Sequence, residues 1–284
     1  MDLIQVQLPR GAWRGDRRLG IATLRPLSDD DGAFLAVEGR GLTPFERTSA
    51  LLERCLALSH PEGIEVTDLP LLGMGDRESL LFHLYREAFG SNIPGVVACP
   101  GCEEPLEFDI AADDVLVQPA PDPARSLERL LESGGRRYHC TVRPPTAADV
   151  EAVLPLGRTE PRTAADELFT RCVAVVDESS HLAAGLPDPG LVGLLDQTFD
   201  ELDPQAETLL TLRCAACGLE FQACLDAGEF LARATRRKST QLFQEVHRLA
   251  LHYHWSESDI LAMSSERRRL YLDLLAADGE AGGL

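Results

Sequence analysis

The sequence predicts an α+β protein whose small strand-rich parts carry a split, zinc-ribbon-like site of four cysteines, followed by a helical C-terminal segment. Three observations lead to this class. Short runs that alternate apolar and polar residues recur between turn residues in the first 228 positions. Two Cys-x-x-Cys pairs, at 99–102 and 214–217, each lie between two such runs. From Glu229 onward, apolar residues instead recur at the three- and four-residue spacing of a helix.

The N-terminal α+β part is expected to cover residues 1–117. Alternating residues at 4–8, and apolar residues again at 21–24, predict short strands. Thr43, followed by Pro44 and Glu46, has the pattern of a capping box and predicts a helix to about residue 59. A second helix is predicted from Gly75 to Gly90. Two strands, at 96–99 and 106–110, are expected on either side of the first cysteine pair.

The middle α+β part is expected to cover residues 118–228 and to end in the second cysteine pair. Three prolines at 118–125 mark the best candidate linker. The expected elements are then a strand at 137–143, a short helix capped by Thr146, a helix at 164–176, a helix near 204–207, and strands at 209–214 and 219–224.

The C-terminal helical segment is expected to cover residues 229–277, with a flexible, Gly-rich tail at 278–284. Leu242, Val246 and Leu249 form an apolar stripe, and Ser256 with Asp259 predicts the start of a short helix. A last helix at 266–275 is expected to bury Leu270, Tyr271 and Leu274.

The charge of the chain excludes some classes of partner. Its 284 residues include 46 acidic and 27 basic side chains, a formal net charge of −19. Nucleic acids and anionic membrane surfaces would repel such a chain, so we expect neither as a partner. No apolar run approaches the ~18 residues of a membrane helix, and the first residues lack the pattern of a signal peptide. We therefore expect a cytoplasmic protein with no membrane insertion.

The sharpest signal is the pair of matched cysteine motifs. Cys99 and Cys102 form one, and Cys214 and Cys217 form the other, with 111 residues between Cys102 and Cys214. Structural zinc sites use four soft ligands in a tetrahedron, and a tight turn between two strands lets both thiolates of a motif reach one ion. Pro100-Gly101 and Gly218 suit such turns. The sequence thus predicts one structural Zn²⁺ held by these four cysteines.

Two alternatives remain open for the cysteines. The knuckles could be metal-free, or Cys-Pro-Gly-Cys could be a redox dithiol. A redox dithiol needs a helix N-terminus to lower its thiol pKa, whereas Cys102 leads into Glu103-Glu104-Pro105 and a predicted strand. The other cysteines, at 55, 140, 172 and 224, have apolar neighbours and are expected to be small buried residues. Cys224 lies closest to the second motif.

Signals for catalysis are weak. The sequence lacks G-x-S-x-G, H-E-x-x-H and Walker A motifs, so we expect no enzyme. His247, His252 and His254 cluster, but on one helix residues 252 and 254 point to different faces and cannot chelate together. The run 29–31 of three aspartates could bind a cation, although an exposed acidic turn is the simpler interpretation.

The dense basic runs lie at 236–238 and 267–269. Between Glu229 and Arg269 there are 8 basic and 5 acidic residues, a net charge of +3 in an otherwise acidic chain. This pattern suits a solvated helix face or a docking surface for an acidic partner or for the acidic body of the protein itself. Trp and Arg are the residue types most often energetic at interfaces. The candidate partner-binding residues are therefore Trp255, Arg267, Arg268, Arg269 and Tyr271, although Trp255 could equally pack the last helix onto the core.

An ordered set of motifs resembles a known family. The set comprises Leu42-Thr43-Pro44-x-Glu46, Gly75-Asp76-Arg77-Glu78, the first cysteine pair after Phe89-Gly90, Asp203-Pro204-Gln205-Ala206 before the second pair and Gly218, Glu245-Val246-His247, Trp255-Ser256-Glu257-x-Asp259, and Arg267-Arg268-x-x-Tyr271. Together they resemble the T4-type phage baseplate hub assembly chaperone family over roughly residues 40–110 and 200–275. One departure is His254, where the pattern has Gly before the Trp, at a position expected to end a helix in the left-handed conformation.

The resemblance implies a non-enzymatic assembly chaperone or structural adaptor for the baseplate or hub of a contractile phage tail or a phage-like contractile injection system. The resemblance implies that its partners are baseplate or hub subunits and that it meets them in the cytoplasm during assembly. It leaves open whether the protein stays in the finished particle. It also implies the two cysteine knuckles as a shared feature. The alternative function is a zinc-ribbon protein-binding or regulatory module unrelated to a tail machine.

Overall fold

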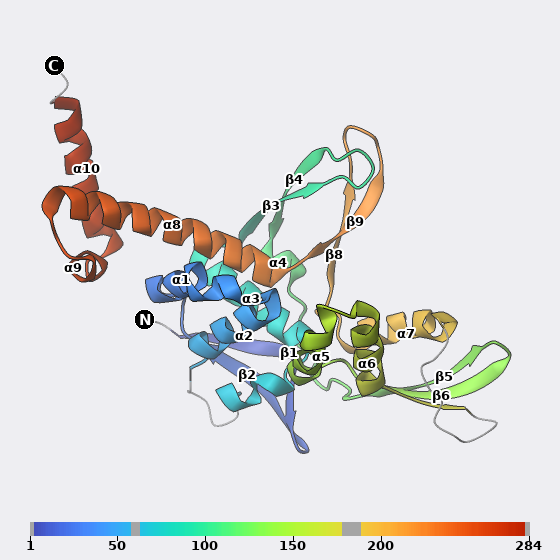
Figure 1. Ribbon diagram of the computed structural model, residues 1–284. Helices are drawn as coiled ribbons and strands as arrows, with labels where there is room; N and C mark the ends of the chain where they lie inside the picture. The colour runs from blue at the N-terminus through green and yellow to red at the C-terminus, as the bar shows by residue number, and fades with distance from the viewer. Residues whose placement is uncertain (1–2, 58–62, 178–188, 282–284) are drawn as a thin grey trace. The chain divides into compact units, whose positions relative to one another are not determined.

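The computed structural model describes residues 3–57, 63–177 and 189–281, and it confirms the α+β class (Figure 1). By its contacts the chain divides into two compact units. Unit 1 comprises residues 1–27 and 43–231, and unit 2 comprises residues 28–42 and 232–284. Unit 1 therefore takes in most of the parts expected at 1–117 and 118–228. Unit 2 joins the C-terminal segment to a short stretch from near the N-terminus.

The first half of unit 1 is a hairpin packed with helices. Its elements are β1 (Ile4–Arg14), β2 (Arg17–Leu24), α2 (Pro44–Cys55), the 3₁₀ helix η2 (Val66–Leu71) and α3 (Met74–Phe89). β1 pairs antiparallel with β2, and the register shifts between Gln7 and Ala12. α3 packs on β1, and the buried side chains include Leu8, Leu52 and Leu80. The Thr43–Glu46 capping box of α2 forms as expected. The helix ends at Cys55, however, and residues 58–59 lie outside the described residues.

Two further hairpins of unit 1 carry the cysteine motifs. One consists of β3 (Asn92–Ala98) and β4 (Pro105–Ala111), and the other of β8 (Thr208–Arg213) and β9 (Glu220–Leu225). Both are antiparallel and pair without a break in register. The short helix α4 (Ala112–Val115) follows β4. Along the strands, more buried residues alternate with exposed ones, so each hairpin shields one face and leaves the other in water.

The remainder of unit 1 is built on a three-stranded sheet. Its strands, in the order β5 (Leu127–Ser133), β6 (Arg136–Val142) and β7 (Val173–Asp177), accompany α5 (Ala147–Gly157), α6 (Pro161–Cys172) and α7 (Pro189–Leu202). A core lies here that contains Val142, Cys172 and Leu195. The structure corrects two expectations: the helix predicted at 164–176 ends at Cys172 and continues as β7, and residues 204–207 form a turn.

Unit 2 is helical. It contains α1 (Asp29–Ala36), η1 (Glu38–Gly41), the part of α8 (Ala227–Tyr253) from residue 232 onward, α9 (Glu257–Leu261) and α10 (Ser265–Ala281). Its core contains Leu242, Val246, Leu249 and Ile260. Residues 278–281, expected in a flexible tail, belong to α10. Among the described residues, no helix is both long and apolar enough to cross a bilayer.

Two sequence expectations for unit 2 are wrong. The aspartates at 29–31, expected in an exposed turn, form the first turn of helix α1. Asp29 and Asp30 are exposed, but Asp31 is buried, because Ser28 caps the helix and Asp31 accepts a hydrogen bond from the N–H of Ser28. Leu270 and Leu274 on α10, expected to be buried, are 65% and 57% exposed. The buried side of α10 instead presents Arg268, Tyr271, Leu272 and Leu275.

Candidate metal centre

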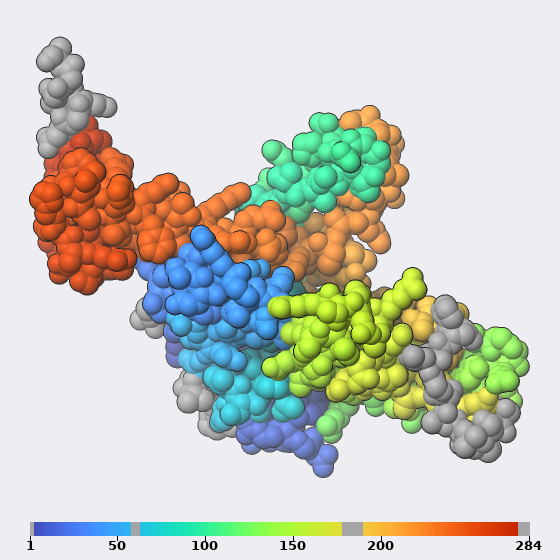
Figure 2. All heavy atoms as spheres, viewed as in Figure 1, coloured from blue at the N-terminus to red at the C-terminus, as the bar shows by residue number. Residues whose placement is uncertain are grey.

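The two cysteine hairpins bring their ends together although their sequences lie far apart (Figure 1). In the first hairpin the last strand pair is Ala98 with Pro105, and in the second it is Arg213 with Glu220. Each pair is followed by a six-residue loop that starts with the first cysteine of a Cys-x-x-Cys motif. The green β3–β4 hairpin and the orange β8–β9 hairpin lie side by side (Figure 2), and cysteine sulfurs of the two are in contact.

The two loops have the same backbone hydrogen bonds. The N–H of Cys99 donates to the carbonyl of Glu104 over 2.9 Å, and the N–H of Cys214 donates in the same way to Leu219. Four residues after each first cysteine, the N–H of Glu103 and that of Gly218 donate back to the cysteine carbonyl. Both residues are left-handed, with φ of 62° and 77° respectively. The left-handed residue of the first loop is therefore Glu103, and not Gly101 as its glycine suggested.

All four sulfurs converge. Cys99 Sγ lies 3.6 Å from Cys217 Sγ, and Cys102 Sγ lies 3.6 Å from Cys214 Sγ. The four atoms are all within 4.8 Å of one another. In a tetrahedron of sulfurs at ~2.3 Å from a metal ion, neighbouring sulfurs are about 3.8 Å apart. The cluster therefore has the composition and size of a four-cysteine metal site, and the predicted convergence of these residues is confirmed.

The electrostatics of the cluster suit a cation. The backbone N–H of Cys217, with that of Ala216, lowers the pKa of Cys214 to about 7. The backbone N–H of Glu104 also favours the thiolate of Cys102, but hydrogen bonds with the neighbouring thiols outweigh it and raise its pKa to about 12. One thiolate forms readily, and each further negative charge is opposed by those already present. A bound cation would remove this repulsion.

The local geometry also bears on the redox alternative. Cys102 and Cys217 are exposed, Cys99 and Cys214 are buried, and none of the four begins a helix. Helix N-termini are the usual means of lowering the pKa of a reactive dithiol, and here both motifs lead into strands. Gly101 lies so close to the opposite loop that a Cβ there would be 2.9 Å from a methyl group of Leu219. A side chain at position 101 would therefore require the exposed side chain of Leu219 to shift.

Among the described residues, the remaining cysteines and the histidines form no second metal site. Cys55, Cys140 and Cys172 are buried as expected, whereas Cys224 is exposed on β9, contrary to expectation. In the described ranges, the four-cysteine cluster is the one group of three or more potential ligands close enough to share a metal ion. His254, expected at a left-handed helix end, has φ of 56° and follows directly after α8.

The candidate partner-binding residues divide into exposed and buried ones. Arg267 and Arg269 are exposed on α10. Trp255 is half-buried in an aromatic cluster, stacked on Tyr253 at a centroid distance of 4.6 Å and edge-on to Tyr271 at 4.8 Å. The three rings join the end of α8 to α10, so Trp255 and Tyr271 contribute packing within unit 2.

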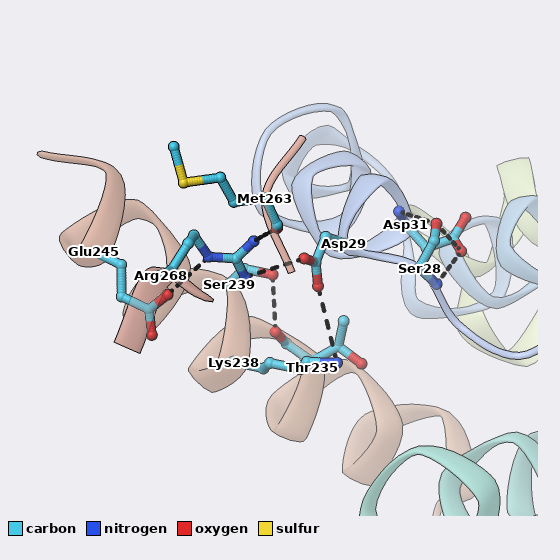
Figure 3. Close-up of polar contacts among 9 residues, drawn as sticks. All are labelled: Ser28, Asp29, Asp31, Thr235, Lys238, Ser239, Glu245, Met263 and Arg268. Atoms are coloured by element: carbon cyan, nitrogen blue, oxygen red, sulfur yellow. Dashed lines mark hydrogen bonds and ion pairs between the residues drawn. The ribbon is translucent and has the colours of Figure 1, made fainter. Parts of the chain in front are cut away.

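Arg268 differs from its neighbours because it lies inside unit 2 (Figure 3). Its guanidinium donates to Glu245 over 3.0 Å, to the carbonyl of Met263 over 2.8 Å and to Asp29 over 3.4 Å. These bonds connect α8, the segment before α10, and α1. The structure therefore places Arg268 in an internal network instead of on the exposed surface where the sequence suggested it.

Sequence reasoning assigned no role to a buried polar cluster in unit 1. Asp76 accepts hydrogen bonds from the backbone N–H groups of Arg10 and Gly11, at 2.9 and 3.1 Å. Asp203 accepts one from the N–H of Gly75 at 3.0 Å. One oxygen of each carboxylate is buried without a hydrogen-bond partner. Burial raises the pKa of Asp203 to about 6, and it also raises the pKa of Asp76.

Residues next to Asp76 and Asp203 in sequence make further contacts within unit 1. Glu78 accepts a hydrogen bond from the N–H of Ala227 at the start of α8, and burial raises its pKa to about 7. Arg77 lies over the ring of Phe45 and donates to Ser49 over 2.8 Å. At the end of α4, the side-chain amide of Gln205 donates to the carbonyl of Val115 and accepts from the N–H of Val117. The sequence did offer one signal for this cluster, namely the polar residues at 76–78, 203 and 205. Buried polar residues of this kind commonly satisfy backbone groups.

Comparison with known proteins gives one family match. The family described as T4 bacteriophage base plate protein matches residues 45–227. This range contains both cysteine motifs and both parts of the buried polar cluster, at 75–78 and 203–206. Searches among curated proteins and among solved structures found no match.

Proposed function

The chain belongs to the T4 bacteriophage base plate protein family, and from this premise we propose that it is a non-enzymatic assembly chaperone or structural adaptor. It serves the baseplate or hub of a contractile phage tail or of a phage-like contractile injection system. It acts in the cytoplasm during assembly, and its partners are baseplate or hub subunits. The observation that carries the proposal is the family match over residues 45–227. The match gives no support to a regulatory module unrelated to a tail.

The proposed docking surface lies on unit 2. Leu251 on α8 and Leu270 and Leu274 on α10 are 61%, 65% and 57% exposed. Leu270 and Leu274 are four residues apart and the exposed Arg267 is three residues before Leu270, so these three side chains lie on one face of α10. An interface with apolar anchors and a charged rim can hold a subunit and still release it, since rim charges make binding sensitive to salt. Trp255 contributes indirectly, because its contacts with Tyr253 and Tyr271 join the end of α8 to α10.

A pull-down with single substitutions in the full chain tests this function. Removing residues 240–284 would be less informative, because α1 would lose Arg268, the partner of Asp29 that α10 supplies. The tagged chain is co-expressed with each baseplate and hub subunit encoded beside it. Variants Leu270→Glu and Arg267→Glu should lose the partner. Leu130→Glu, at an equally exposed leucine on β5 (56%), is the matched control and should retain it.

The two parts of the proposal fail in different ways. If the unmodified chain retains none of the subunits at low salt, the assembly role is wrong. If a subunit binds but both α10 variants retain it as well as Leu130→Glu does, the role stands and the surface is elsewhere. A bound subunit should dissociate as salt is raised, because exposed charges separated by more than about 10 Å are screened at 0.1 M.

We also propose that the cysteine cluster holds one structural Zn²⁺. Four thiolates in a tetrahedral arrangement are the ligand set of structural zinc, with no position left for a substrate. Cys99, Cys102, Cys214 and Cys217 would hold the ion, and the ion would fix the two hairpins to each other at their ends. Purified protein should contain about one zinc per chain. Cys217→Ser should lose it, while Cys224→Ser, at an exposed cysteine outside the cluster, should keep it. Metal-free protein with unchanged hairpin protection in hydrogen exchange would exclude the zinc.

A further inference from the structure

Unit 1 contains a cavity of ≈ 260 Å³ away from the cysteine hairpins. It lies between β1, the residue that precedes α3 and the residue that caps α5. Its wall includes Arg10, Trp13, Gly73, Arg125, Arg143 and Thr146, and none of its lining residues is acidic. The chain has 46 acidic and 27 basic residues. A cavity with three arginines and no carboxylate in its wall is therefore a local reversal of the charge of the protein.

Carboxylates near the three arginines of the cavity wall neutralise their positive charge only in part. The guanidinium of Arg10 donates to two carbonyl groups, of Leu202 and of Ala124. Burial lowers the pKa of Arg10, and the nearby carboxyls of Asp203 and Asp76 act in the opposite direction. Arg125 lies 3.7 Å from the exposed carboxylate of Asp16. Only Arg143 has a close two-point partner, Asp149, at 2.6 and 2.9 Å.

The arginines are held at the wall by their surroundings. The guanidinium groups of Arg10 and Arg125 lie 5.6 and 5.8 Å from the ring centroid of Trp13, within the range of a cation–π contact. The loop that carries Arg125 is tied to β1, since the N–H of Ala120 donates to the carbonyl of Pro9 over 3.0 Å. Arg143 is fixed by Asp149 in the first turn of α5. Donors that are already ordered lose little freedom when a ligand binds.

We propose that this cavity binds one oxyanion, a carboxylate or a phosphate group, through the guanidinium groups of Arg125 and Arg143 beside Trp13. Guanidinium forks match the geometry of both groups. The cavity is smaller than the ~300–1,000 Å³ of pockets for drug-sized ligands, so it takes a single anionic group. The group comes either from an acidic side chain of a protein segment or from a free phosphate. This site is independent of the cysteine cluster and of the docking surface on unit 2.

Trp13 makes the proposal measurable. The chain has two tryptophans, so a Trp255→Phe background leaves Trp13 as the only one. Its fluorescence is titrated with inorganic phosphate and with N-acetyl-glutamate amide, at constant ionic strength. N-acetyl-glutamine amide is the neutral control, and calorimetry repeats each titration without a fluorophore. For one small anion, a dissociation constant on the order of 1 mM is expected.

Two variants of exposed arginines separate site binding from general charge. Arg125→Gln should weaken binding about tenfold, because it removes a charged hydrogen-bond donor. Arg136→Gln, at a 69% exposed side chain on β6, should leave it unchanged. A stronger response to phosphate or to the glutamate derivative identifies the source of the group. No saturable heat or fluorescence change with either anion overturns the proposal, as does equal binding by the Arg125→Gln variant.

Discussion

Asp203→Asn is predicted to change how the stability of unit 1 depends on pH. Asp203 is 3% exposed, one of its oxygens has no hydrogen-bond partner, and burial raises its pKa from 3.8 to about 6. The folded state therefore holds the proton more tightly than the unfolded state does. At 1.36 kcal/mol per pKa unit, this shift corresponds to about 3 kcal/mol.

The sign follows from the raised pKa. The stabilisation is fully present below 3.8, the unfolded value, and is lost as the pH rises through about 6. Asn keeps an oxygen for the N–H of Gly75 and cannot ionise. The free energy of unfolding of the Asn variant should therefore gain about 2–3 kcal/mol relative to the parent chain between about pH 4 and pH 8. A constant offset caused by the amide does not affect this difference.

The assay is urea unfolding of unit 1, followed by Trp13 fluorescence in the Trp255→Phe background at intervals across that pH range. Asp200→Asn, at an exposed aspartate on α7, is the matched control and should give a curve parallel to that of the parent. Glu78, whose pKa is raised to about 7, changes the shape of all curves equally and cancels in the comparison. Parallel curves for Asp203→Asn and the parent would refute the burial argument.

Three further substitutions test other parts of the structure. Gly75→Ala should destabilise unit 1 by about 1–3 kcal/mol in urea unfolding, because its Cβ would lie 2.0 Å from a carboxylate oxygen of Asp203. Gly193→Ala on α7, where a Cβ meets open space, is the control and should not lower the stability. An equal loss of stability in both variants would contradict the clash. Residues 103 and 218 both have left-handed backbones. Glu103→Gly should therefore raise the melting temperature and Gly218→Ala should lower it, each by the equivalent of about 1 kcal/mol. A lower melting temperature in both variants would show that the two loops are not equivalent. Arg268→Met should lower the stability of unit 2 by about 3–5 kcal/mol, because the substitution leaves Glu245 without its charged donor. Unfolding is followed by Trp255 fluorescence in a Trp13→Phe background. Arg269→Met, at an exposed arginine, is the control, and similar effects of the two substitutions would contradict the internal role of Arg268.

Local signals predicted the elements that local chemistry determines. The cysteine site followed from two matched motifs, because thiolate ligation by strand–turn–strand knuckles does not depend on the surrounding fold. The caps at Thr43 and Ser256 followed from side chains that bond their own first turn. The left-handed residue at His254 followed from the family pattern. For the two caps and for His254 the deciding contacts lie within about five residues, whereas the cysteine site joins two such local turns that are 112 to 118 residues apart.

Two features were not predicted correctly, the strand β5 and the buried face of α10, because the local sequence pattern did not distinguish between alternatives. β5 was not predicted, although Gly134 and Gly135, both left-handed, form a two-residue turn between it and β6. On α10, apolar residues at 270, 271, 272, 274 and 275 surround most of the helix, so periodicity could not select the buried face. The choice depends on Arg268, whose partners Asp29 and Glu245 are remote in sequence.

The buried pair of motifs could not be derived from spacing. Asp76 and Asp203 act on backbone groups of Arg10 and Gly75 that lie 66 and 128 residues away. A sequence shows that such residues are polar and that they precede predicted elements. It does not show which distant backbone N–H groups lack partners, and those groups are what the two carboxylates satisfy.

Unit 2 is made from two pieces of chain, residues 28–42 and 232–284, and this has a consequence for synthesis. The first piece leaves the ribosome 190 residues before the second begins. At ~5–20 residues per second this interval lasts roughly 10–40 s. During it, α1 has neither the guanidinium that later bonds Asp29 nor the serine that later lies against Gly32. The exposed leucines of α10 are translated after residues 1–269, so a partner can meet the proposed surface only once those residues have been made.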